Sequence, residues 1–149
     1  MTCSETRLQS MLWQNGTLVL LDQTKLPLQE EYIECRDYRR VAEAIRRLEV
    51  RGAPAIGAAA AFGLVLGAAE TVRNQADLAA ELPEVAAELK GTRPTAVNLF
   101  WAIERMMQVY ASCQNDCSAA QILTKLEAAA VEIADKDKQV NESIARHGA

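Results

Sequence analysis

The sequence predicts an α+β fold, in which a small N-terminal antiparallel sheet of about three strands precedes a bundle of about five helices. Three observations lead to this prediction. A hairpin signal lies near the N-terminus, apolar residues recur at helical spacing from residue 37 onward, and Gly or Pro separates the helical stretches. Strands are therefore expected within residues 1–36, and helices within residues 37–149.

The strands are predicted around the dipeptide Asn15-Gly16, which is a strong signal for a two-residue hairpin turn. This turn would join residues 11–13 to residues 17–21, and a further extended segment at residues 28–35 follows Pro27. Roughly three strands are the minimum for a small sheet that is stable when it packs on one face.

The first two helices are predicted from a cap and a pair of helix breakers. Asp37 can cap a helix, Gly52 ends it, and Pro54 opens the next one. The inward face of the first helix consists of Val41, Ala44, Ile45 and Leu48. In the second helix, Gly63 and Gly67 are one turn apart and allow close packing.

A third helix is predicted from about Asp77 to Lys90, with Pro83 either kinking or dividing it and Gly91 ending it. Pro94 is expected to start the fourth helix, with Trp101 in the core. The apolar face of this helix consists of Leu99, Ile103, Met106 and Tyr110.

The last helix is predicted from the capping box that Ser118 forms with Gln121. Its inward residues are Ile122, Leu126, Ala129 and Ile133, and it becomes polar at residues 135–138.

Composition and charge favour a single cytoplasmic domain. The chain has 149 residues, of which 50% are apolar and only 5% aromatic, so its core is built mainly from aliphatic side chains. A net charge of −4 argues against nucleic-acid binding. The basic residues are interleaved with acidic ones on a helix, which indicates a solvated face, and they are Arg36, Arg39, Arg40, Arg46 and Arg47.

Membrane and metal sites are not expected. The N-terminus lacks the basic and apolar regions of a signal peptide. The uncharged stretch at residues 53–69 is rich in Ala and Gly, which favours a packed core helix over a membrane span. The four cysteines (Cys3, Cys35, Cys113 and Cys117) lack zinc-site spacing, and His147 is the only histidine, so free thiols are expected.

The candidate site is the motif RGAPAIG at residues 51–57, which places a cation and a glycine immediately before a helix start. Amide groups at a helix start and the positive end of its dipole favour an anion, and Arg51 adds a planar fork that matches phosphate or carboxylate oxygens. Gly52 allows the backbone to approach a ligand closely. The motif GTRPT at residues 91–95 repeats this arrangement around Arg93. A purely structural role stays open for both motifs, as does convergence of the two arginines on one anion.

Three segments resemble the methylthioribose-1-phosphate isomerase family: RGAPAIG at 51–57, GTRPTAVNLFW at 91–101 and NESIARHG at 141–148. The N-terminal segments at 11–13 and 20–27 are also similar to that family. Its superfamily includes ribose-1,5-bisphosphate isomerase and the regulatory subunits of initiation factor 2B. The resemblance covers essentially the whole chain.

The resemblance implies an N-terminal domain whose C-terminal α/β partner, with the family's catalytic Cys and Asp, lies outside these residues. It implies that Arg51, Gly52, Ala53 and Arg93 bind the phosphate of a sugar substrate, with no catalytic residue, metal or cofactor in this chain. The full-length protein would be a homodimeric aldose–ketose isomerase of methionine salvage, and residues 1–149 alone would be inactive. The alternatives are a ribose-1,5-bisphosphate isomerase and a protein-binding regulatory subunit of the initiation factor 2B type.

Overall fold

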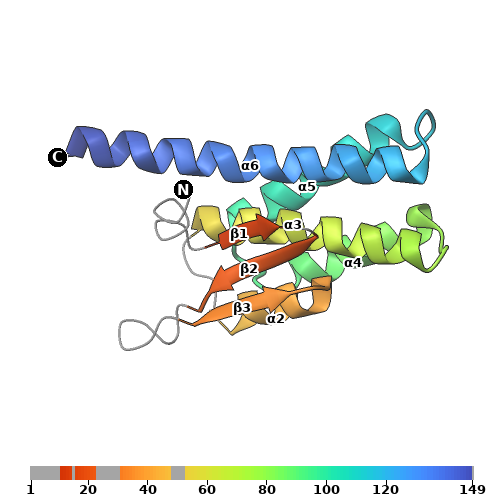
Figure 1. The fold of residues 1–149 in the computed structure, drawn as a ribbon, viewed down its shortest axis with the longest axis horizontal. Helices are drawn as coiled ribbons and strands as arrows, with labels where there is room; N and C mark the ends of the chain where they lie inside the picture. The colour runs from red at the N-terminus through yellow and green to blue at the C-terminus, as the bar shows by residue number, and fades with distance from the viewer. Residues whose placement is uncertain (1–10, 15, 23–30, 48–52, 149) are drawn as a thin grey trace.

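A long central helix organises the fold, with a small sheet on one side and four further helices around it (Figure 1). The computed structural model describes residues 11–14, 16–22, 31–47 and 53–148, with backbone alone for residues 14, 53, 54 and 136–148. The described elements, in chain order, are β1 (Met11–Gln14), β2 (Thr17–Leu21), β3 (Tyr32–Cys35), α2 (Tyr38–Arg46), α3 (Ala53–Arg73), α4 (Leu78–Lys90), α5 (Val97–Cys113) and α6 (Ala119–Gly148). The predicted α+β class is confirmed.

The sheet is antiparallel, with strand order β1-β2-β3, and the predicted hairpin is present. Gly16 adopts a φ of 73°, in the left-handed region that a tight hairpin turn requires. In the central strand, Leu18 and Leu20 are fully buried, and Leu18 lies opposite Trp13 on β1 and Cys35 on β3. The third strand begins at Tyr32, while residues 23–30 lie outside the described part of the chain.

The first helix, α2, begins as predicted. The Asp37 carboxylate accepts a hydrogen bond from the backbone N–H of Arg40 at 2.9 Å, which pairs one amide at the start of the helix. Val41, Ala44 and Ile45 are buried on its inward face, and Leu48 lies outside the described residues.

Helix α3 forms the core of the molecule. Every residue from 56 to 68 is buried, and this stretch contains no charged side chain. Within α3, the segment Ala55–Arg73 is long and apolar enough to cross a membrane, but 78% of it is buried inside the protein. A mostly buried apolar helix of this length is also typical of the core of a globular domain.

The glycines of α3 admit side chains of neighbouring helices. A Cβ atom on Gly63 would lie 3.2 Å from both Leu89 of α4 and Val41 of α2. A Cβ atom on Gly67 would lie 2.6 Å from Val85 of α4. Both glycines therefore allow close packing, as predicted, and the groups that approach them are side chains.

Helix α4 passes through Pro83 without dividing. Its N-terminus is capped by Asp77, whose carboxylate accepts from the N–H of Ala79 at 3.1 Å, and Gly91 is its C-cap. Pro83 has no N–H, so one backbone carbonyl in the preceding turn lacks its bond within the helix. Because Pro83 is exposed, this carbonyl lies on the solvated side of α4. Of the two predicted effects of Pro83, division of the helix is therefore wrong, since α4 is continuous from Leu78 to Lys90.

Two expectations for α5 are wrong. The helix begins at Val97 and not at Pro94, because residues 93–96 form a turn in which the Ala96 N–H donates to the Arg93 carbonyl at 2.9 Å. Pro94 occupies the second position of this turn, which its fixed φ favours. Trp101 is 54% exposed instead of buried, because it lies on the side of α5 opposite the buried face. That face contains the predicted residues Leu99, Ile103, Met106 and Tyr110, together with Ala102 and Cys113.

Helix α6 begins with the predicted capping box. The Ser118 N–H donates to the Gln121 side chain at 2.9 Å, and the Gln121 N–H donates back to the Ser118 hydroxyl at 3.3 Å. Ile122, Leu126 and Ile133 are buried. At its C-terminal end α6 extends beyond the rest of the molecule (Figure 1).

Trp13 of β1 connects the sheet to two helices. Its ring stacks on Phe62 of α3 with centroids 4.8 Å apart, and its indole N–H donates to Glu127 of α6 at 2.6 Å. The stack buries a large apolar surface, and the indole N–H, which needs a partner when it is removed from water, has one in Glu127.

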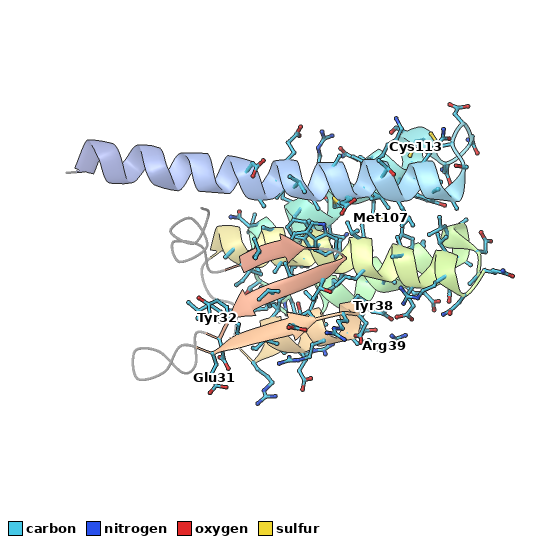
Figure 2. The ribbon with its side chains drawn as sticks, in the orientation of Figure 1. Glu31, Tyr32, Tyr38, Arg39, Met107 and Cys113 are labelled. Carbon is cyan, nitrogen blue, oxygen red and sulfur yellow. The ribbon has the colours of Figure 1, made fainter. Side chains whose placement is uncertain are left out.

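The basic side chains around α2 form surface ion pairs. Arg36 pairs with Glu34 at 2.8 Å, and Arg39 pairs with Glu70 of α3 at 3.2 Å. The Arg39 guanidinium also lies 4.6 Å from the centre of the Tyr38 ring (Figure 2), and Tyr38 itself is half-buried against the core. These contacts support the interpretation of this helix face as solvated.

We predict that the amides of residues 56–66 are among the slowest in the protein to exchange with deuterium. Their helix is buried on all sides, so exchange there requires opening close to global unfolding. Exchange followed by NMR would measure this, and fast exchange throughout residues 56–66 would contradict the assignment of α3 as the core.

We also predict that Gly67→Ala lowers the free energy of unfolding by up to about 2 kcal/mol. Overpacking against the stiff Val85 side chain costs roughly 1–3 kcal/mol, and the better helix propensity of Ala returns about 1 kcal/mol. In a Val85→Ala background the clash disappears, so the same substitution should stabilise. Denaturant unfolding of the four proteins measures both effects, and equal effects in the two backgrounds would disprove the contact.

Candidate functional site

Two of the four residues predicted to bind phosphate lie in the described part of the chain. Ala53 is the first residue of α3, and Arg93 begins the turn that precedes α5. Arg51 and Gly52 lie outside the described residues. The structure therefore describes the two helix starts of the site. Helix α3 begins inside the first motif, at Ala53, and α5 begins at Val97, just after the second motif at residues 91–95.

The start of α5 has free hydrogen-bond donors. Its N-cap is Ala96, which offers no side-chain acceptor, and the first bond of the helix runs from the Phe100 N–H to the Ala96 carbonyl at 3.2 Å. The N–H groups of residues 97–99 precede that bond and have no acceptor within the helix. They are directed out of the helix start, where they can donate to an anion.

The starts of α3 and α5 lie against each other. A Cβ atom on Gly57 would lie 3.0 Å from the backbone carbonyl oxygen of Asn98 and 3.6 Å from the Cβ of Ala102. Gly57 is about one turn into α3, and Asn98 is the second residue of α5. A side chain at this position would push the Asn98 carbonyl away by a few tenths of an ångström, so Gly57 allows the close separation of the two helix starts.

The electrostatics of both helix starts favour a negative charge. Neither first turn contains an Asp or Glu, so no carboxylate of the helices themselves offsets the positive dipole ends. Arg93 is half-buried beside the start of α5. The nearby Lys90 lies 3.8 Å from Glu104, which partly neutralises its charge. Arg93 is thus a cation in the turn directly before the start of α5.

Gly57 is the functional residue whose role the sequence did not reveal. It belongs to the motif at residues 51–57, but the sequence contained no sign that a second helix start would contact it. A glycine in the first turns of an otherwise Ala-rich helix was the available signal. Among the described residues, no group of three or more His, Cys, Asp or Glu side chains is placed to hold a metal ion.

Comparisons with known proteins agree with this fold and motif set. Residues 49–149 match the model of the Initiation factor 2 subunit family (IF-2B). The methylthioribose-1-phosphate isomerase of Heliobacterium modesticaldum is 47% identical over 142 residues, covering 95% of this chain and 41% of that protein. The protein of the same name from Thermosipho africanus is 48% identical, covering 94% of this chain and 40% of that protein.

Two solved structures share the fold. The 5-methylthioribose 1-phosphate isomerase from Pyrococcus horikoshii superposes with a TM-score of 0.79 at 34% identity, covering 86% of this chain and 36% of that one. The translation initiation factor eIF-2B subunit delta from A. fulgidus superposes with a TM-score of 0.71 at 39% identity, covering 87% of this chain and 37% of that one. The chain thus spans about two fifths of the length of the relatives it matches. Because the family model covers most of the chain, the protein belongs to the initiation factor 2 subunit family.

Proposed function

We propose that this chain is the phosphate-binding, N-terminal part of an aldose–ketose isomerase. The enzyme would convert 5-methylthioribose 1-phosphate to 5-methylthioribulose 1-phosphate, a step of methionine salvage. The relatives that carry this enzyme's name are 47% and 48% identical to the chain across nearly all of its length, which supports the choice of substrate.

The observation that carries the proposal is the contact between the two helix starts at Gly57 and Asn98. A phosphate has oxygens on all sides, so donors from two directions bind it better than donors from one. Two adjacent dipole ends without carboxylates in their first turns, next to Arg93, supply such donors.

Each predicted residue has a separate task in this proposal. Arg51 and Arg93 would pair with phosphate oxygens through their guanidinium forks, while the backbone at Gly52 and Ala53 approaches the phosphate closely. The chemistry moves a hydrogen between C1 and C2 of the sugar and needs an acid and a base. The family resemblance implies that these groups lie outside residues 1–149, so this chain would bind and orient the substrate.

The wider assignments belong to the same proposal. Residues 1–149 would form one domain of a two-domain protein that acts in the cytoplasm as a homodimer. No cofactor or metal is invoked, because proton transfer between adjacent carbons requires only acid and base groups.

A protein-binding role is the second candidate, supported by the likeness to the A. fulgidus protein described as an eIF-2B subunit. A shared fold does not fix the function, and a ribose-1,5-bisphosphate isomerase would also use a phosphate site. Titrating the longer protein with each phosphosugar, and assaying isomerisation, separates the three functions. Turnover of 5-methylthioribose 1-phosphate alone is the expected result.

We predict that Arg51→Ala and Arg93→Ala each weaken binding of the phosphosugar to the longer protein by roughly 10- to 100-fold. Hydrogen bonds to charged groups contribute about 1.5–3 kcal/mol each, which corresponds to this range. Lysine at either position should restore only part of the affinity, because it lacks the planar fork. Isothermal titration and steady-state kinetics measure the loss.

Arg36→Ala is the matched control for these arginine variants. Its side chain is 77% exposed and pairs with Glu34, away from both helix starts, so affinity should not change. Wild-type affinity in both Arg51→Ala and Arg93→Ala would refute the assigned site.

We further predict that Gly57→Val weakens phosphosugar binding more than Gly91→Ala does. The valine side chain must push the start of α5 away from α3, since even its Cβ would lie 3.0 Å from the Asn98 carbonyl. Gly91 is close to Arg93 in sequence, yet a Cβ there would only reach an ordinary contact of 3.4 Å. Equal affinities in folded samples of both variants would show that the separation of the helix starts does not matter.

A further inference from the structure

The connection between α5 and α6 brings two cysteines together at the opposite end of α5 from Arg93. Cys113 is the last residue of α5, and Cys117 directly precedes Ser118, which caps α6. The Cys117 N–H donates to the Cys113 carbonyl at 3.0 Å, so the backbone between them closes one helix-like turn. Figure 2 shows Cys113 at this end of the molecule, where the chain turns from α5 into α6.

The spacing of the two residues suits a disulfide. Residues four apart in a helix-like turn have Cα atoms about 6 Å apart and side chains on the same face. Disulfide-bonded cysteines have Cα separations of about 4.4–6.8 Å, which this spacing matches, and Cβ separations of about 3.5–4.5 Å. Because Cβ atoms four residues apart on a helix are about 5–6 Å apart, closing the bond draws the two Cβ atoms closer together. The two thiols are both reduced in the structure.

The side chains of Cys113 and Cys117 interact with each other. Burial raises the pKa of Cys113, and negative charge on Cys117 and a hydrogen bond with its side chain raise it further. Cys113 also donates to the Val109 carbonyl at 3.2 Å, which holds its Sγ in place. Chain spacing and side-chain contact therefore point to the same pair.

The two thiols differ in access to solvent. Cys113 is 4% exposed and packs in the core, whereas Cys117 is half-buried at the surface of the turn. A soluble oxidant therefore reaches Cys117 first, and Cys113 is positioned to attack whatever forms there. This order of access is that of an attacking and a resolving cysteine.

We propose that Cys113 and Cys117 form a reversible redox site, closed by thiol–disulfide exchange with a small-molecule disulfide such as oxidised glutathione. The Cys117 thiolate attacks one sulfur of the small disulfide, forms a mixed disulfide and releases one glutathione thiolate. The Cys113 thiolate then attacks the Cys117 sulfur, which forms the protein disulfide and releases the second glutathione. The two protons from the cysteines end on the two glutathione thiols, so the protein pair is oxidised and the small disulfide reduced.

Closing this bond would fix the end of α5 to the start of α6. Helix α5 extends for about 25 Å, so the site is remote from the paired helix starts and does not depend on the proposed activity. We expect the disulfide to restrict motion of the turn at residues 113–118, which sets the position of α6 relative to α5.

Peptide mapping of the whole protein tests the proposal directly. Trypsin releases residues 106–125 as one peptide that contains Cys113 and Cys117 and no other cysteine. The protein is equilibrated with increasing ratios of oxidised to reduced glutathione, quenched, alkylated under denaturing conditions and digested. We expect an unalkylated peptide, about 2 Da lighter than the reduced one, to become the main species in excess oxidised glutathione and to disappear after dithiothreitol.

Two variants test which cysteine attacks first. The wild-type measurement tests disulfide formation by itself and does not depend on these variants. Cys113→Ser should accumulate glutathione on Cys117, and Cys117→Ser should leave Cys113 alkylated with little adduct. Two alkylated cysteines at every ratio, a wild-type mixed disulfide that never closes, or disulfides only between two protein molecules would each overturn the proposal.

Discussion

The complete burial of α3 is the constraint on which the rest of the structure depends. A helix with no charged residue between positions 56 and 68 has no solvated face, so every side of it must be covered. Helices α2, α4, α5 and α6 and the sheet provide that cover (Figure 1). The abundance of Ala and Gly in α3 keeps the helix thin, which lets five partners reach it at once.

Glycines along α3 determine where each partner sits. Gly63 and Gly67 receive side chains from α2 and α4, while Gly57 receives the backbone of α5. The last contact differs in kind, because a carbonyl group of the helix start itself approaches the glycine. Packing in the core and the placement of the proposed phosphate site are therefore consequences of the same helix.

Helix α5 carries different chemistry at its two ends. Its start provides uncapped amides beside Arg93, and its end brings a buried thiol next to a half-buried one. Between them, Leu99, Ile103 and Met106 anchor the helix in the core, so neither end is free to shift alone. The two proposed sites, for a phosphate at the start of α5 and for oxidation at its end, are therefore carried by one rigid element.

The sequence by itself determined the order of the elements and the local chemistry at their ends. The hairpin, the Asp37 cap and the Ser118–Gln121 box are confirmed because each depends on contacts within a few residues. The same holds for the fold class and for the family, since both follow from patterns that the chain carries in order.

Tertiary structure decided which of these local features meet. Pro94 favours a helix start in the sequence, yet residues 93–96 form a turn and α5 begins only at Val97. Leu99 and Ile103 face the core, which leaves Trp101 outside it. The contact between Gly57 and Asn98 joins positions forty-one residues apart, the difference between their numbers. No local pattern encodes such a pairing, because it depends on how several helices pack around one buried helix. The positions of these helices are determined only in the assembled core.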